Sequence, residues 1–360
     1  MSIPTPKLSM ASIPSEILHH IAESYLYDLD PLTCNIVSVL TTCSLFRDLF
    51  LTKLYSNICI YSLDQLSRFV SPTSGAHIYC PHYTLDTLTI NIPGVPGGGD
   101  GTLPSTVGGM SRSRDRLLLA SLALSLCPKV QKVSLEFFSI RHSEILTSDN
   151  FRATEAQAFE NAIKGLKSVK HLRWVPPRCD TNPIRGLSIV IVDQVIPSLA
   201  KGLIGCENLE TLELWNTMLP LTRGSDLAQS LIQICTVRQD WKRTMNLNLR
   251  SITGLDPKVV SNLVLASPPI KVNIADGFVG SIWGARIDKH AVQECMRDTL
   301  NLNRDSTSST SQTSSKASSI ATSRTTSPEL LIQTTLAKAS ENINITILQG
   351  GIAGCPTINH

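Results

Sequence analysis

A six-residue pattern of apolar and polar positions recurs along most of the chain. Apolar residues occupy its first, fourth and sixth positions in LDTLTI (85–90), VQKVSL (130–135), VKHLRW (169–174) and LETLEL (209–214). The last two apolar positions are kept in YSNICI (55–60), TMNLNL (244–249), PIKVNI (269–274) and NINITI (342–347). Alternation of this kind is typical of a strand with one buried face. Because helix-like stretches separate the segments, the pattern predicts an α/β fold.

The fourth positions of these segments set the period of the repeat. They are Ile58, Leu88, Val133, Leu172, Leu212, Leu247, Val272 and Ile345. They lie about 25 to 45 residues apart until the last, longer gap, and periods of this size mark repeat architectures. Leu-x-x-Leu-x-Leu at such intervals resembles a leucine-rich repeat, whose helix–strand units bury their apolar faces by stacking. The resemblance implies an irregular leucine-rich-repeat-like α/β solenoid. The alternative is an ordinary α/β sheet domain.

The fifth position of each segment is expected to point away from the core, because side chains alternate between the two faces of a strand. These residues are Thr89, Ser134, Arg173, Glu213, Asn248 and Asn273. The next outward residue of the clearest repeat is Trp215. Tryptophan and arginine are common energetic anchors of protein interfaces, so we expect Arg173, Glu213 and Trp215 to contact a protein substrate. Alternatively, Trp215 packs beneath a neighbouring loop.

Three short helices are predicted ahead of these repeats, within residues 12–60. In the first, Ile17, Leu18, Ile21 and Tyr25 recur at helical spacing behind Pro14. The second begins at Asp30-Pro31, and the third is LFRDLFLTKLY (45–55). A unit of about 45 residues rarely completes a core alone. Its apolar surface must therefore meet either the rest of the chain, as a plain cap, or a partner.

The same segment resembles an F-box of the fungal kind. The matching residues are Ile13-Pro14, Glu16-Ile17-Leu18 and Ile21, then Leu40, Cys43, Phe46-Arg47 and Leu49, and finally Leu54-Tyr55 and Ile58. F-box proteins use this trihelical unit to bind a Skp-type adaptor, which links them to a cullin-RING ubiquitin ligase. The resemblance implies adaptor contact by Pro14, Ile17, Leu18, Ile21, Leu40 and Phe46.

The predicted domain organisation follows from these patterns and from two biased segments. NIPGVPGGGDGTLPSTVGGMSRSRDR (91–116) is rich in Gly, Pro and Ser, and is expected to be a mobile loop. A Ser/Thr-rich segment (305–328) is expected to be a disordered insertion. The predicted parts are a disordered N-terminus (1–11), an F-box-like unit (12–60), a repeat domain (61–304), the insertion (305–328), and a C-terminal helix and strand of the repeat domain (329–360).

Composition narrows the classes of partner. Hydrophobic residues make up 42% of the 360 residues and the net charge is only +3. We therefore expect no nucleic-acid partner, since phosphate binding needs a basic face. The longest apolar stretch (117–127) is too short to span a bilayer, so no membrane partner is expected. Ten scattered cysteines without a CxxC pair and no visible secretory signal favour the cytoplasm or the nucleus.

Candidate catalytic groups are sparse. HIYCPH (77–82) places His77, Cys80 and His82 close together, but a zinc site needs three or four ligands and no partner cluster lies nearby in the sequence. We predict no metal, no cofactor and no catalysis by this chain. The leading hypothesis is an F-box-like adaptor subunit that holds a protein substrate for ubiquitination. The alternatives are a repeat-protein scaffold with no link to ubiquitin and, as a third class, an enzyme with an unrecognised site.

Overall fold

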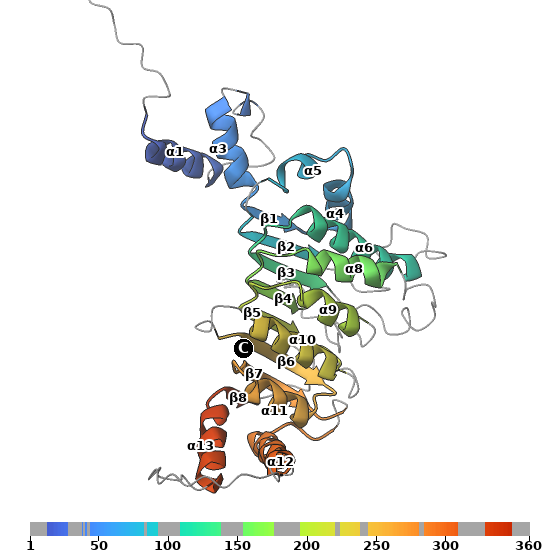
Figure 1. Cartoon of the computed structure of the whole chain (residues 1–360). Coiled ribbons are helices and arrows are strands. Elements are labelled where there is room, and N and C mark those ends of the chain that lie inside the picture. Colours follow the sequence, from blue (N-terminus) through green and yellow to red (C-terminus); the bar gives the residue numbers. More distant parts are fainter. Residues whose placement is uncertain are drawn as a thin grey trace, which may run out of the picture.

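The computed structural model of the chain describes residues 13–27, 38, 40–41, 44–82, 85–92, 109–137, 154–175, 195–219, 224–237, 244–280, 284–308 and 328–347. Within these residues a long sheet runs through the molecule, with helices stacked beside it (Figure 1).

The sheet has eight strands in the described residues, and every pairing is parallel. The strands are β1 (Asn57–Ile60), β2 (Thr87–Ile92), β3 (Lys132–Phe137), β4 (His171–Val175), β5 (Thr211–Trp215), β6 (Asn246–Thr253), β7 (Lys271–Phe278) and β8 (Ile343–Thr346). Their order across the sheet is their order along the chain, and each strand pairs with the next. The predicted α/β class is therefore confirmed.

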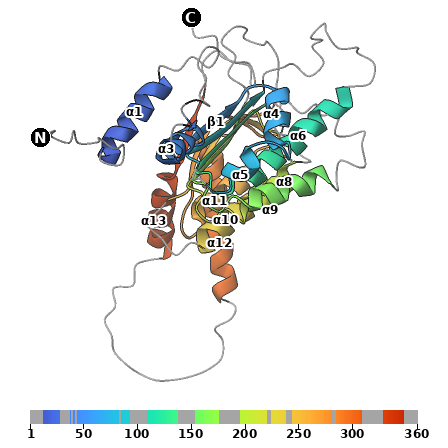
Figure 2. The ribbon, with the colours of Figure 1, turned by 90° about the horizontal axis from the view of Figure 1, so that it is seen from above.

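Helices connect the strands and pack on one another. They are α4 (Leu63–Val70), α5 (Ala76–Tyr79), α6 (Gly109–Leu126), α8 (Glu155–Lys164), α9 (Ile196–Leu203), α10 (Gly224–Val237), α11 (Pro257–Leu265), α12 (Lys289–Ser308) and α13 (Pro328–Ser340). Those from α6 to α11 lie side by side along one face of the sheet (Figures 1 and 2). Their close approach is visible at Gly202 of α9, where a Cβ atom would lie 2.8 Å from Cβ of Ile163 in α8.

Local sequence signals start several of these helices. Ser62 caps α4: its Oγ accepts a hydrogen bond from the Gln65 amide (3.1 Å), while Gln65 Oε1 accepts one from the Tyr61 amide (2.7 Å). This is close to a capping box, which satisfies amides that a helix start leaves unpaired. Asp256 caps α11 more simply: its Oδ1 accepts a hydrogen bond from the Lys258 amide (2.9 Å), and Pro257 takes the first helical position.

The core lies between the sheet and the helices, and the apolar residues of the six-residue pattern fill it. The fourth positions from Ile58 to Val272 form one continuous row across β1 to β7. In that row Leu88 and Leu212 are fully buried, and in the sixth-position row Trp174 is 1% exposed. The repeating pattern thus predicted the inward face of these seven strands.

The predicted register of the last strand is wrong. The sequence pattern aligns Ile345 with Val272, whereas in the structure Val272 pairs with Ile343 and Ile345 pairs with Ile274. NINITI alternates apolar and polar residues without interruption, so a shift by two residues keeps the same side chains inward. Alternation alone therefore could not choose between these registers.

A helix pair precedes the sheet and consists of α1 (Ser15–Tyr27) and α3 (Ser44–Leu54). Leu18 and Phe50 are buried in it, and the rings of Tyr25 and Phe50 meet edge to face with centroids 5.7 Å apart. The predicted middle helix falls mostly outside the described residues. The predicted boundary at residue 60 is too late, since Asn57–Ile60 is the first strand of the sheet.

Two other predicted boundaries also shift. Of the loop expected over 91–116, residues 91–92 belong to β2 and those from Gly109 onward belong to α6, while the residues between them lie outside the described part of the chain. The insertion expected over 305–328 is bounded by α12, which ends at Ser308, and by α13, which begins at Pro328. Residues 309–327 lie outside the described residues, so the expected disorder of the insertion stays a prediction. Composition does not fix the ends of such segments, because a neighbouring helix extends into polar sequence.

Candidate functional site

The face of the sheet opposite the helices carries the predicted outward column. Thr89, Ser134, Arg173, Glu213, Asn248 and Asn273 pair in register from β2 to β7, and Asn344 of β8 extends the row. Parallel strands lie about 4.8 Å apart, so each of these side chains has the next one as its neighbour. The strand pattern therefore assembles one polar row from widely separated parts of the chain.

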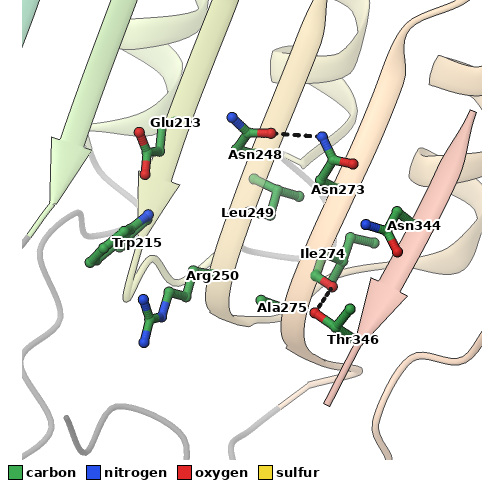
Figure 3. A pocket seen from close by; sticks show the side chains of 10 residues that line it. All are labelled: Glu213, Trp215, Asn248, Leu249, Arg250, Asn273, Ile274, Ala275, Asn344 and Thr346. Atoms are coloured by element: carbon green, nitrogen blue, oxygen red, sulfur yellow. Dashed lines mark hydrogen bonds between the residues drawn. The ribbon is translucent and has the colours of Figure 1, made fainter. Parts of the chain in front are cut away.

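A pocket of about 240 Å³ opens on this face over β5 to β8 (Figure 3). Its lining residues are Glu213, Trp215, Asn248, Leu249, Arg250, Asn273, Ile274, Ala275, Asn344 and Thr346. They come from four consecutive strands. The pocket therefore belongs to the sheet itself.

One side of the pocket is built around Trp215. The guanidinium carbon of Arg250 lies 4.6 Å from the centroid of the Trp215 ring, and that of Arg173 lies 5.7 Å from it. Arg173 also lies against Glu213, with 3.7 Å between Nε and Oε2, and both side chains are about a quarter exposed. Cation–π contacts and the ion pair hold these long side chains in place.

The other side of the pocket is lined by amides and a hydroxyl. Asn273 Nδ2 donates a hydrogen bond to Asn248 Oδ1 (2.8 Å), and Thr346 Oγ1 donates one to the carbonyl of Ile274 (3.4 Å). Ala275 pairs with Arg250 on one side and with Thr346 on the other, and its small side chain leaves room in the pocket (Figure 3). Amide and hydroxyl groups can both donate and accept hydrogen bonds, so this side suits a polar ligand group.

Three residues with left-handed backbone follow the pocket in adjacent strands. Asn216, Ser251 and Asp276 have φ angles of 48°, 53° and 56°, and each comes directly after an outward residue of β5, β6 or β7. Asparagine and aspartate tolerate this conformation better than serine does. Strained backbone of this kind collects at functional sites, which supports the pocket as the candidate site.

The predicted substrate-contact residues come together here. Arg173 lies beside both Glu213 and Trp215, and Trp215 is neither fully exposed nor buried. Sequence reasoning missed Arg250, although it pairs with Trp215 in the seventh-position row. Extending the outward alternation by one residue beyond each six-residue segment would have found it. Asn344 and Thr346 were missed because the outward column was followed only as far as Asn273; both face outward in either register of β8.

The predicted adaptor-contact residues divide by exposure. Ile17 and Ile21 are 49% and 44% exposed, and Pro14 is exposed as well, whereas Leu18 is only 4% exposed. Leu40 is half-buried, as is Phe46, whose ring stacks on Phe50 with centroids 5.8 Å apart. Leu18 therefore holds the helix pair together from inside. The exposed surface of α1 comes from its neighbours, which include Tyr25 at 39% exposure.

The described residues hold no group of three or more His, Cys, Asp or Glu side chains placed to bind a metal ion. His77 Nε2 lies 3.1 Å from the carbonyl of Val70, while Cys80 is buried against Cys127. A hydrogen bond from the Cys127 thiol lowers the pKa of Cys80, and the same contact together with burial raises the pKa of Cys127.

No family model matches the chain, and a search of curated proteins found no match either. Across the part of the chain that the structure describes, no helix combines the length and the apolar character that crossing a membrane requires.

Proposed function

We propose that this chain is an F-box-like substrate-recognition subunit. In this proposal residues 12–60 dock on a Skp-type adaptor of a cullin-RING ubiquitin ligase, and the sheet presents a protein substrate for ubiquitination. The chain performs no chemistry itself. It acts by proximity, because tethering a substrate near a charged ubiquitin carrier raises the effective concentration of the reacting groups.

The observation that carries the proposal is the apolar surface of the helix pair. Ile17, Ile21 and Tyr25 of α1 and Leu45 of α3 are each between 39% and 49% exposed. Large apolar side chains gathered on a small unit mark an interaction site more often than isolated ones do. A Skp-type adaptor is the occupant that the F-box resemblance implies for this surface.

The sheet supports the second half of the proposal. Consecutive parallel strands, each followed along the chain by helical segments that pack on one face, are what a leucine-rich-repeat-like solenoid would require. Such solenoids leave the strand face available for protein partners. The pocket around Trp215 and Arg250 lies on that face, and Trp and Arg are residues that anchor protein interfaces.

The adaptor proposal is tested by Ile21→Asp. Because Ile21 is exposed, the chain should fold normally, but a carboxylate without a partner in an apolar interface costs several kcal/mol. A micromolar contact has about 8 kcal/mol in total, so co-purification of the Skp-type adaptor should be lost. Leu122→Asp is the matched control, since Leu122 on α6 is 45% exposed, and it should leave adaptor binding unchanged. Undiminished adaptor binding by Ile21→Asp would reject the proposal.

One observation favours the alternative of a repeat-protein scaffold with no link to ubiquitin. Tyr55, at the end of α3, packs on the main core and on the ring of Tyr79, with centroids 5.3 Å apart. A helical cap that closes the first repeat would make the same contact. The Ile21→Asp experiment separates the two functions, because a cap does not bind an adaptor.

A further inference from the structure

The charges around the pocket do not balance. Glu213 is the acidic lining residue, and its carboxylate already faces Arg173. Among the described residues, no carboxylate lies within 4.0 Å of the Arg250 guanidinium, which instead rests on the Trp215 ring at 4.6 Å. With one ion pair and one further cation, the pocket and its rim carry an excess positive charge. A negatively charged ligand group would neutralise this excess.

The polar side chains of the pocket add hydrogen-bond donors. In the bond between the two asparagines, Asn273 uses one donor and Asn248 accepts, so the amide nitrogen of Asn248 keeps both of its own hydrogens for another partner. That nitrogen points toward β5, the strand of Glu213 and Trp215 (Figure 3). The Arg250 guanidinium lies at the other end of the pocket, beside Trp215, where a fixed guanidinium can bind a carboxylate by charge-assisted hydrogen bonds (Figure 3). The amide nitrogen of Asn248 can bind a second polar group of the same ligand.

The size of the pocket indicates which kind of ligand supplies the negatively charged group. Sites for small molecules measure about 300–1,000 Å³ and enclose most of their ligand, whereas this pocket measures about 240 Å³ and is open along the sheet. It therefore fits a side chain projecting from a longer segment that lies over the strands. A flat sheet face with one anchoring pocket is typical of protein recognition.

We infer that the pocket receives an aspartate or glutamate side chain of an extended protein segment, with the carboxylate bound by Arg250. The inference rests on the proposed function in one respect, since that segment would belong to the captured substrate. It gives the substrate a chemical class: a protein with an exposed acidic stretch.

The test uses the full chain and a fluorescein-labelled octaglutamate peptide, followed by fluorescence anisotropy. Octaglutamate should bind, an octaglutamine peptide should not, and the affinity should fall as salt screens the charges. A peptide with phosphoserine in place of alternate glutamates distinguishes the source of the anion. Binding of that peptide without binding of octaglutamate would overturn the inference of a carboxylate, and so would equal binding of octaglutamine.

Two variants locate the binding in the pocket. Arg250→Gln should weaken octaglutamate binding at least 10-fold, whereas Arg68→Gln should not, although it removes the same charge from an exposed position on α4. Thr346→Glu places a negative charge at the exposed edge of the pocket and should weaken binding as well, and this variant decides the matter if Arg250→Gln fails to fold. Unchanged octaglutamate binding by the folded variants would overturn the inference.

The outcome is separable from that of the adaptor experiment. Arg250→Gln should retain the Skp-type adaptor, because Arg250 lies on β6 and the adaptor surface lies on α1 and α3. If octaglutamate fails to bind while the adaptor still does, the inference alone is wrong. If the adaptor fails to bind while octaglutamate does, the docking proposal is wrong and the acidic ligand stands.

Discussion

The helix pair α1–α3 and the sheet with its helices differ in how fully they bury their apolar residues. In the sheet, the fourth and sixth positions of β2 to β7 are all buried, and none is more than 3% exposed. In the helix pair, Leu18 and Phe50 are buried, but Ile17, Ile21, Tyr25 and Leu45 remain between 39% and 49% exposed. The sheet therefore completes its core within the chain, whereas the helix pair does not.

The difference follows from how each region is built. Every strand of the sheet interior has a neighbour on both sides, and the helix layer covers its apolar face. Among the described elements, α1 packs mainly on α3, and α3 packs on α1 and on β1. A small unit cannot cover all of its apolar surface, so its stability should depend less on the sheet than on what binds it.

The largest expected effect comes from making the same leucine-to-alanine truncation in both regions and comparing the losses of stability. Leu212→Ala removes a fully buried side chain from β5 and should lower the free energy of unfolding by about 3–4 kcal/mol, through lost burial and the cavity left behind. Leu18→Ala should lower it by less than about 1 kcal/mol in the main transition, because Leu18 contributes only to the small helix pair.

Tryptophan fluorescence during denaturation separates these two outcomes. Trp174 and Trp215 lie in β4 and β5, and the chain has no tryptophan before Trp174, so fluorescence follows the sheet and not the helix pair. Hydrogen exchange in α1 should instead become faster in Leu18→Ala. An equal loss of stability in both variants would show that the two regions unfold as one unit, and the comparison would fail.

A second prediction concerns the close packing around Gly254 in the sheet region. Gly254 has φ +70°, and a Cβ atom there would lie 1.7 Å from the carbonyl oxygen of Leu219. Gly254→Ala should therefore cost about 3 kcal/mol, from backbone strain together with the steric clash. Gly280→Ala is the control: its φ is +82°, but no atom lies within 4 Å of the added Cβ, so only the strain of about 1–2 kcal/mol remains. Equal costs in thermal denaturation would contradict the packing argument.

The sequence predicted most of the sheet because its pattern carries two separate signals. Leu88, Val133, Leu172 and Leu212 alternate with polar neighbours, which fixes the face, and each follows a buried apolar residue three positions earlier, which fixes the register. The segments around Leu247, Val272 and Ile345 carry only the first signal; the prediction was right for the first two and slipped by two residues at Ile345. Face and register thus need different information.

The candidate site was predicted in part for the same reason. Arg173, Glu213 and Trp215 follow from alternation within well-marked strands. Arg250 lies beyond the six-residue pattern, and its contact with Trp215 depends on β6 continuing to Thr253. Extending the outward alternation by one residue beyond the segment would have indicated Arg250 as it did Trp215, but the contact between the two side chains was visible only in the structure.

The smallest expected effect concerns acid stability of the helix pair. Lys53 of α3 donates a hydrogen bond to Glu23 of α1, and this bond and the lysine charge hold the pKa of Glu23 below its ordinary value of 4.5. A carboxylate with a lowered pKa in the folded state stabilises that state above its unfolded pKa, and the contribution is lost as pH falls through the folded pKa. Because the side chains of Lys53 and Glu23 are 32% and 51% exposed to solvent, the effect should be small. Hydrogen exchange in α1, corrected for intrinsic rates, should accelerate below pH 4.5 in the wild-type chain and less so in Glu23→Gln.

The fluorescence transition of the sheet should be the same in both proteins. An equal acid response of α1 in wild type and Glu23→Gln would show that other groups control it, and that this ion pair does not join the two helices.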